Sequence, residues 1–407
     1  MISIAGGCYV ERCVDPPWDQ LFGSGGRAAA ALSALDNNVK LTTYIDEKHR
    51  PALEALAAIF GFKVDHTTIV TTPSFSYYHG LSHPRIRPDL HRISQASPLA
   101  LDDATILRFG MIEGDAVVRG DAVVYDPQNA FNPRPFHENG SSAKRLAIVA
   151  NYREAKTLAQ IKLSDVPTAD LGQAILQNHN ADVAVIKQGS FGTTVVTPTD
   201  QRHLSAFRTE RVWPIGSGDV FAAIFAHEWG VLELDPFDSA LTASLATAYY
   251  CESTYLPIPP DLKSKYSLAP VINSGAFPQT NNQIYLAGPF FTMTERWLIE
   301  QSRTHLAEQG FKVFSPLHDV GYGTAEKVVP EDIAAIKRSH LLFAILDGLD
   351  PGTLFEVGYA RALNKPVIAF VQNEAPNNLK MLKGTECEIV NDFASSIYRA
   401  TWAAMAL

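Results

Sequence analysis

The chain has 407 residues, of which 46% are hydrophobic and 19% are charged, and its formal net charge is −9. This length and composition suit two globular domains and exclude an intrinsically disordered chain. The acidic balance also excludes a protein that holds a nucleic-acid polymer through phosphate contacts, because such binding needs a dense basic surface.

The first residues lack the basic stretch of a secretory leader, and no apolar run in the sequence reaches the ~18 residues that span a bilayer. We therefore expect a cytoplasmic protein with no membrane partner. The cysteines have no recognisable metal-ligand spacing and are predicted to be reduced, mostly buried thiols. They are Cys8, Cys13, Cys251 and Cys387.

Short apolar runs recur along the chain and predict buried strands. Continuous runs, rather than alternating ones, are typical of strands covered on both faces. Because helical stretches separate these runs, we predict an α/β protein with mainly parallel sheets. The runs cover residues 122–125, 146–149, 183–186, 284–287 and 341–346.

A glycine-rich segment near the N-terminus, which includes Gly25 and Gly26, leads through Arg27 into an alanine-rich helix. An arginine that faces a substrate site would favour an acceptor with negative charge, and a surface helix position is an equally good interpretation. In the aromatic segment 71–87, Tyr77 or His79 could stack on a base. An ordinary strand pair with buried aromatics is the preferred interpretation of this segment.

Asn151 and Glu154 follow the strand predicted at 146–149. Their spacing places both side chains on one face of a helical turn, where an amide and a carboxylate can organise metal-bound water. A plain helix start explains the same two residues.

Two glycine turns come next. Gly189 and Gly192 lie between apolar runs, and Gly216-Ser217-Gly218-Asp219 leads directly into an apolar helix. Paired glycines let the backbone approach a phosphate, and a helix N-terminus directs N–H groups to the same point. Asp219 in the first helical turn can then accept a proton from an attacking hydroxyl, or it can simply cap the helix.

Prolines and polar residues replace any periodic pattern between residues 256 and 282. Such a composition cannot bury a core and predicts a connection. We therefore expect a first domain at 1–268, a linker at 269–282 and a second domain at 283–407.

The second domain is predicted to begin with the strand that carries Tyr285 and with the turn at Gly288. A capping box formed by Thr292 and Glu295 then opens a helix that ends at Gly310.

Carboxylates gather after the apolar run at 341–346. Asp350 and Glu356 lie where open α/β sheets bind ligands, at the carboxyl end of a strand. Glu356 falls in an otherwise apolar helix, so its carboxylate should be partly buried, which is costly and marks a functional candidate. An acidic first helical turn is the alternative explanation. Asp332 fits either a site residue or an exposed helix start.

The motifs of the first domain resemble those of the PfkB (ribokinase-like) sugar and nucleoside kinases, which have a small β lid. The resemblance implies ATP and Mg²⁺ as cofactors, with Asp219 as the catalytic base and no direct protein ligand to the metal. Arg27 replaces a usual asparagine, a usual aspartate is matched only loosely by Glu11 or Asp15, and Trp213 lies near the place of a usual acidic residue. The other implied roles are an anion hole and ATP site at Gly216, Ser217, Gly218, Gly189 and Gly192, a magnesium and phosphate site at Asn151 and Glu154, and a sugar site at Gly25, Gly26 and Arg27.

Residues 283–395 resemble the nucleoside 2-deoxyribosyltransferases, which implies a flavodoxin-like or Rossmann-like parallel sheet. The resemblance implies that Glu356 attacks the anomeric carbon of a nucleoside and forms a glycosyl-enzyme ester. Asp350 matches a contact to the sugar hydroxyls, Asp332 matches the residue that handles the proton on the base, and Tyr285 matches the residue that orients the nucleophile. Because family members share active sites between subunits, we expect a homo-oligomer.

The two resemblances together predict a bifunctional enzyme with small-molecule partners. The first domain would phosphorylate a nucleoside or pentose, and the second would cleave or transfer at the N-glycosidic bond of a nucleoside or its 5′-monophosphate. The carboxylate of Asp350 would repel a phosphate, which favours an unphosphorylated sugar end. Alternatively, Ser315 or Ser339 supplies hydroxyls that bind a phosphate. In the alternative, a single-activity sugar kinase carries a nucleotide-binding sensor or assembly module as its second domain.

Overall fold

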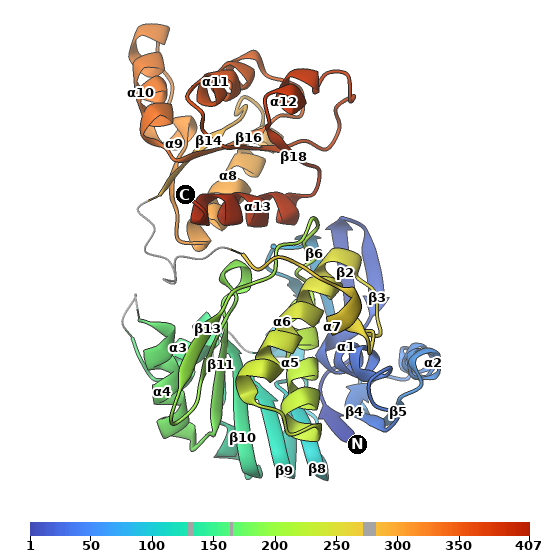
Figure 1. Ribbon diagram of the computed structural model, residues 1–407. Helices are drawn as coiled ribbons and strands as arrows, with labels where there is room; N and C mark the ends of the chain where they lie inside the picture. The colour runs from blue at the N-terminus through green and yellow to red at the C-terminus, as the bar shows by residue number, and fades with distance from the viewer. Residues whose placement is uncertain (129–132, 163–165, 272–281) are drawn as a thin grey trace. The chain divides into compact units, whose positions relative to one another are not determined.

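The computed structural model describes residues 1–128, 133–162, 166–271 and 282–407 (Figure 1). No helix within these ranges is both long and apolar enough to cross a membrane. The cysteines, all of which lie in these ranges, are buried free thiols, as predicted.

The chain folds as two compact units. The first comprises Met1–Thr209 and Trp213–Pro270, and the second comprises Glu210–Val212 and Val271–Leu407. Most of the linker expected at 269–282 lies outside the described residues.

A nine-stranded sheet forms the centre of the first unit. Pairing is parallel from β5 through β11, and β12 and β13 add an antiparallel edge. The apolar runs predicted as strands lie within β9, β10 and β11, which confirms the mainly parallel sheet. In sheet order the strands are β5 (Lys63–Thr68), β4 (Val39–Ile45), β1 (Ile2–Ala5), β8 (Leu99–Phe109), β9 (Ala116–Asp126), β10 (Ser142–Asn151), β11 (Val183–Lys187), β12 (Thr193–Val196) and β13 (Gln201–Leu204).

Helices cover both faces of this sheet. Successive strand residues point to opposite faces, so apolar neighbours in one strand pack into two different cores. Val149 packs into one core with the first group of helices, and its neighbour Ile148 packs into another core with the second group. The first group is α1 (Gly23–Leu32), α2 (Arg50–Phe60), α5 (Ser217–Phe225), α6 (Pro236–Ser253) and α7 (Leu262–Lys265), with the π-helical η4 (Ala226–Val231). The second group is α3 (Tyr152–Leu158) and α4 (Thr168–His179), and three short 3₁₀ turns are η1 (Leu90–Arg92), η2 (Phe136–Asn139) and η3 (Gly189–Phe191).

A smaller four-stranded sheet belongs to the same unit and corresponds to the expected β lid. Its order is β3 (Trp18–Leu21), β2 (Val10–Asp15), β6 (Ser74–His79) and β7 (Arg85–Arg87). Because β6 and β7 pair antiparallel, the strand pair expected in segment 71–87 is confirmed. The aromatics of β6 are not all buried as expected, since Tyr78 is 66% exposed.

The second unit is built on a five-stranded sheet whose pairs are all parallel. Its order is β15 (Lys312–Phe314), β14 (Gln283–Ala287), β16 (Leu341–Ile345), β17 (Val367–Phe370) and β18 (Glu388–Val390). The chain starts at β14, moves out to β15 and then returns past β14 to β16. The order therefore reverses between β14 and β16, and such a switch point is where open α/β sheets bind ligands.

Helices lie on both sides of this sheet (Figure 1). The capping box predicted at the start of α8 is present, since the Thr292 and Glu295 side chains each accept from the other residue's backbone N–H. Figure 1 places α8 (Met293–Glu308) and α13 (Phe393–Met405) on one side of the strands, and α10 (Ala325–Arg338), α11 (Pro351–Ala362) and α12 (Lys380–Gly384) on the other. The single turn α9 (Pro316–Asp319) follows β15.

Candidate functional site

Charged and polar residues meet at the carboxyl edge of the large sheet. Asp126 ends β9, Asn151 ends β10 and Lys187 ends β11, and Asn151 and Lys187 are register partners. The Lys187 Nζ atom lies 2.6 Å from an Asp126 carboxylate oxygen. Burial raises the pKa of Asp126, and the charge of Lys187 opposes this shift.

Glu154 adds a second buried carboxylate to this edge. Burial, and then the charge of Asp126, raise the pKa of Glu154 to about 7. Asn151 and Glu154 form a capping box for α3, with side-chain to backbone distances of 3.0 and 2.8 Å. The pair predicted to organise metal-bound water thus has the geometry of a helix start, and the Glu154 carboxylate is also electrostatically coupled to Asp126.

The N-terminus of α5 meets the same edge. Gly216 precedes the helix with φ of +79°, and a Cβ there would lie 2.2 Å from the guanidinium carbon of Arg27, so the position needs glycine. A Cβ on Gly218 would lie 3.3 Å from Lys187 Nζ. An ammonium group and a helix N-terminus therefore converge beside Ser217 and Gly218, and both attract an anion.

Arg27, on α1, is completely buried at the centre of an ion cluster. Its Nη1 atom lies 2.8 Å from an Asp219 carboxylate oxygen, and both of its terminal nitrogens bond to the Glu11 carboxylate. Its Nε atom donates to the Tyr250 hydroxyl at 3.1 Å. All three guanidinium nitrogens therefore donate to protein acceptors, and the interpretation of Arg27 as a surface residue is wrong.

Asp219 is buried and is held through both carboxylate oxygens. Arg27 bonds to Oδ2, and the Gln128 side chain donates to Oδ1 at 2.5 Å. Gln128 follows β9, so the residue predicted as the catalytic base connects α1, α5 and the carboxyl edge of the sheet.

The lid sheet also contributes to this cluster. Glu11 lies on β2 and Tyr77 on β6, and burial followed by the charge of Glu11 raises the pKa of Tyr77. Trp213 packs against Trp18 of β3, with ring centroids 5.2 Å apart. Of the two loose candidates for the family aspartate, the structure brings Glu11 to the cluster.

The remaining predicted glycines lie in turns around this edge. Gly25 and Gly26 are in the first turn of α1, directly before Arg27. The turn η3 between β11 and β12 begins at Gly189 and is followed by Gly192. A Cβ on Gly192 would lie 2.1 Å from the Leu204 carbonyl oxygen. The expected strand, glycine turn and strand are thus present.

In the second unit, Tyr285 and Glu356 meet at the switch point. Tyr285 is completely buried in β14, and its hydroxyl donates to Glu356 on α11 at 2.5 Å. Burial raises the pKa of Glu356 to about 7. The hydrogen bond from Tyr285 lowers this pKa, and the charges of Asp332 and Asp350 raise it.

Asp332 lies inside α10 (Ala325–Arg338), seven residues after its first residue and six before its last, and not at a helix start. Burial raises the pKa of Asp332 to about 6. Its Oδ1 atom is buried and has no hydrogen-bond partner among the described residues. The interpretation as an exposed helix start is therefore wrong, since α10 begins at Ala325.

Asp350 caps the N-terminus of α11. Its Oδ2 atom accepts from the Thr353 backbone at 2.8 Å and from the Thr353 hydroxyl at 2.9 Å. Gly288 follows β14 and packs against Ile299 and Ile345. Both residues thus lie in the loops that leave β14 and β16, beside Tyr285 and Glu356.

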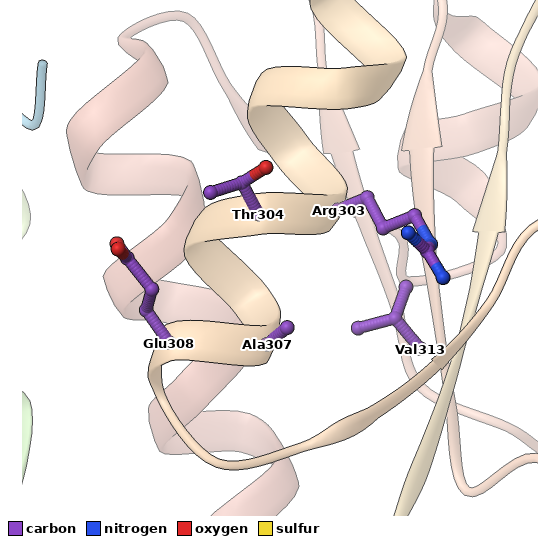
Figure 2. A pocket seen from close by; sticks show the side chains of 5 residues that line it. All are labelled: Arg303, Thr304, Ala307, Glu308 and Val313. Atoms are coloured by element: carbon purple, nitrogen blue, oxygen red, sulfur yellow. The ribbon is translucent and has the colours of Figure 1, made fainter.

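A separate pocket in the second unit lies beside the edge strand β15 (Figure 2). The last turns of α8 line it, and α8 runs back from the carboxyl end of β14, so the pocket lies away from the carboxyl edge. None of the predicted site residues lines it. Its lining residues are Arg303, Thr304, Ala307, Glu308 and Val313.

No group of three His, Cys, Asp or Glu side chains in the described ranges is arranged to hold a metal ion. Mg²⁺ usually keeps several waters and binds through one or two carboxylates together with substrate phosphates. The two buried carboxylates of Asp126 and Glu154 fit that mode of binding, because both interact with Lys187, whose Nζ atom lies beside the anion-attracting N-terminus of α5.

Asp126, Lys187 and Gln128 were absent from the sequence prediction. Asp126 and Lys187 each end an apolar strand, as Asn151 does, and this shared position is the signal that could have found them. Nothing in the local sequence marks Gln128.

Comparison with known proteins agrees with these two arrangements. Residues 120–250 match the family described as pfkB family carbohydrate kinase, and residues 284–392 match the family described as nucleoside 2-deoxyribosyltransferase. No curated protein matches the chain.

Solved structures that are similar to part of this chain share little sequence with it. A ribokinase from Thermotoga maritima is 14% identical, with 65% of this chain and 98% of that chain covered and a TM-score of 0.44. A nucleoside kinase from Methanocaldococcus jannaschii is 12% identical, with 63% and 95% covered and a TM-score of 0.47. A fructokinase from Vibrio cholerae is 13% identical, with 64% and 95% covered and a TM-score of 0.45.

The first unit thus has a ribokinase-like α/β fold and the second a Rossmann-like parallel sheet. The chain carries a pfkB-family carbohydrate kinase segment followed by a nucleoside 2-deoxyribosyltransferase-family segment.

Proposed function

We propose that the chain is a bifunctional enzyme of nucleoside metabolism. Its second unit cleaves or transfers at an N-glycosidic bond, and its first unit phosphorylates a nucleoside or pentose with ATP. The observation that carries the proposal is the group of Tyr285, Glu356 and Asp332, which are coupled by charge at the switch point of a parallel sheet.

In the proposed glycosidic step, Glu356 is the nucleophile. A carboxylate oxygen of Glu356 forms an ester bond to the anomeric carbon, and the carbon–nitrogen bond to the base breaks with its electron pair going to the base. The Tyr285 hydroxyl holds the attacking carboxylate in place through its hydrogen bond to Oε1. The sugar then leaves the enzyme by transfer to water or to a second base.

Asp332 is suited to supply the proton that the departing base needs. Its pKa of about 6 keeps part of the population protonated near neutral pH, and its buried Oδ1 atom has no partner among the described residues. An acid with a pKa near the working pH is effective in proton transfer.

Asp350 supports a substrate with an unphosphorylated sugar end. Its charge contributes to the raised pKa of Glu356, so it lies within electrostatic reach of the nucleophile. Its Oδ2 atom caps α11, and Oδ1 makes no hydrogen bond to the described residues, which leaves it available for a sugar hydroxyl. A phosphate there would meet like charge.

In the first unit, Asp219 is the proposed base that accepts the proton of the acceptor hydroxyl. Lys187 and the N-terminal amides of α5 would stabilise negative charge on the transferring phosphoryl group. Asp126 and Glu154 would hold a magnesium ion through its waters, and that ion would supply further positive charge to the nucleotide phosphates.

The test is to incubate purified protein with a panel of nucleosides and 5′-monophosphates and to measure free base by chromatography. Wild type should release base from at least one compound, and Glu356→Gln should release none. Leu354→Ala, an exposed change on the same helix, is the control. Absence of release from the whole panel would favour a single-activity kinase with a sensor or assembly module.

A further inference from the structure

We propose that Glu11 and its partner Arg27 make the acceptor site of the first unit selective for uncharged sugars or nucleosides over their phosphates. This inference rests on the proposed kinase function, and it names the acceptor class that the kinase site takes. It is carried by the ion cluster that joins Glu11, Arg27 and Asp219.

Arg27 is not available to bind an anionic acceptor. Its side chain is fully buried, and its three nitrogens donate to Glu11, Asp219 and Tyr250. Its terminal nitrogens form a forked pair with both oxygens of Glu11, the geometry that binds a carboxylate most firmly. A substrate phosphate would have to displace a protein carboxylate that is already in place.

The cluster carries an excess of negative charge. Glu11 and Asp219 contribute two carboxylates, and Arg27 contributes one positive charge. The nearby Tyr77 and Tyr250 hydroxyls stay neutral, because burial raises the pKa of each.

The nearby ammonium group does not change this balance. Lys187 lies beside α5 at 2.6 Å from Asp126, and Glu154 is coupled to the same pair. Lys187 lies at the N-terminus of α5, where the nucleotide phosphates are proposed to bind. A negatively charged acceptor would therefore find neither Arg27 nor Lys187 free to pair with it, because each already pairs with a protein carboxylate.

The acceptor must approach this cluster closely. Its attacking hydroxyl has to come within hydrogen-bond reach of Asp219, which is bonded directly to Arg27. The rest of a pentose then lies a few ångströms from Glu11, where burial leaves charge repulsion poorly screened. Repulsion between like charges is a general means of rejecting the wrong partner.

The test compares acceptors that differ in one phosphate. Ribose and 2-deoxyribose, with their 1-phosphates and 5-phosphates, are assayed for acceptor-dependent ADP formation from MgATP and as competitors. Because the 1-phosphate and the 5-phosphate of each sugar are both tested, at least one of the two leaves the attacking hydroxyl free. We expect kcat/KM for the uncharged sugar to exceed that for either phosphate by about a hundredfold or more.

Substitutions at Glu11 locate the source of this selectivity. Glu11→Gln removes one negative charge and should reduce the preference for the uncharged acceptor by about tenfold. Glu11→Asp keeps the charge and should keep the preference. Asp19→Asn makes the same acid-to-amide change at an exposed position of the lid sheet and should leave the preference unchanged.

The outcomes separate the two levels of the proposal. No phosphorylation of any sugar or nucleoside would overturn the kinase function itself. Phosphorylation of a sugar phosphate at a kcat/KM equal to or above that of the free sugar would overturn the inference and leave the kinase function standing. An unchanged preference in folded Glu11→Gln would show that Glu11 does not set the selectivity.

Discussion

The Tyr285 hydroxyl and the Glu356 carboxylate of the second unit lie 2.5 Å apart. Tyr285 belongs to β14, and Glu356 belongs to α11, the helix that follows the neighbouring strand β16 at the switch point of the sheet. The contact stabilises the ionised form of Glu356, while burial and the charges of Asp332 and Asp350 disfavour that form. The pKa of Glu356 is raised to about 7 as the net result, so the proposed nucleophile titrates within the physiological range.

Base release by wild type should have a narrow, bell-shaped pH profile. Glu356 must lose its proton to attack, and its pKa is about 7, whereas Asp332 must keep a proton to donate, and its pKa is about 6. The two groups interact, so the apparent values belong to the pair. We expect kcat/KM to peak between these values and to fall on both sides.

Asp332→Asn should remove the alkaline limb of that profile. The acidic limb should also move to lower pH, because the charge of Asp332 helps to raise the pKa of Glu356. The rate at the optimum should fall about a hundredfold with loss of the general acid. A pH profile with an unchanged alkaline limb would exclude Asp332 as the proton donor.

Tyr285→Phe should shift the acidic limb to higher pH. The hydroxyl lowers the pKa of Glu356, so its loss should raise that pKa by roughly one unit, which corresponds to a charged hydrogen bond. The measurement is the pH dependence of kcat/KM for base release. Tyr359→Phe, on the same helix as Glu356, should leave the profile in place.

Arg27→Met should destabilise the protein by about 3–5 kcal/mol, because it leaves Glu11 and Asp219 buried without their partner. Equilibrium unfolding in urea would measure the loss. Arg12→Met breaks the exposed pair with Asp19 and should cost less than about 1 kcal/mol. A similar small cost for both variants would contradict the buried-cluster description.

Asp219→Asn should reduce acceptor-dependent ADP formation by about 10²-fold or more, because an amide cannot accept the hydroxyl proton. Asn keeps an oxygen that can accept from Arg27, so the melting temperature should change little. Base release should be unaffected, since it is assigned to the other unit. ADP formation at the wild-type rate would exclude Asp219 as the base.

The strands could be predicted from the sequence because a buried strand records its environment locally, as a run of apolar residues. The same holds for the capping box at Thr292 and Glu295, where both partners lie within one helical turn. Proline also favours a helix start, yet α10 begins at Ala325 and holds Pro330 inside it, so Asp332 could not be placed from local sequence.

The ion cluster could not be predicted in this way. The burial of Arg27 depends on Glu11 of the lid and on Asp219 of α5, which approach it only in the folded chain. The alanines around Arg27 are compatible with a surface helix as well as with a packed one. The pairing of Lys187 with Asp126 could not be predicted either. Their opposite charges compensate each other in the folded chain, although the two residues end different strands, β11 and β9.

The covalent glycosyl–Glu356 ester is the most direct test of the central claim. Protein mixed rapidly with a substrate from the panel would be quenched in acid, digested and examined by mass spectrometry. We predict that the peptide containing Glu356 gains the mass of one bound glycosyl group, and that Glu356→Gln shows neither the adduct nor base release. Base release that persists in Glu356→Gln without an adduct would contradict the account.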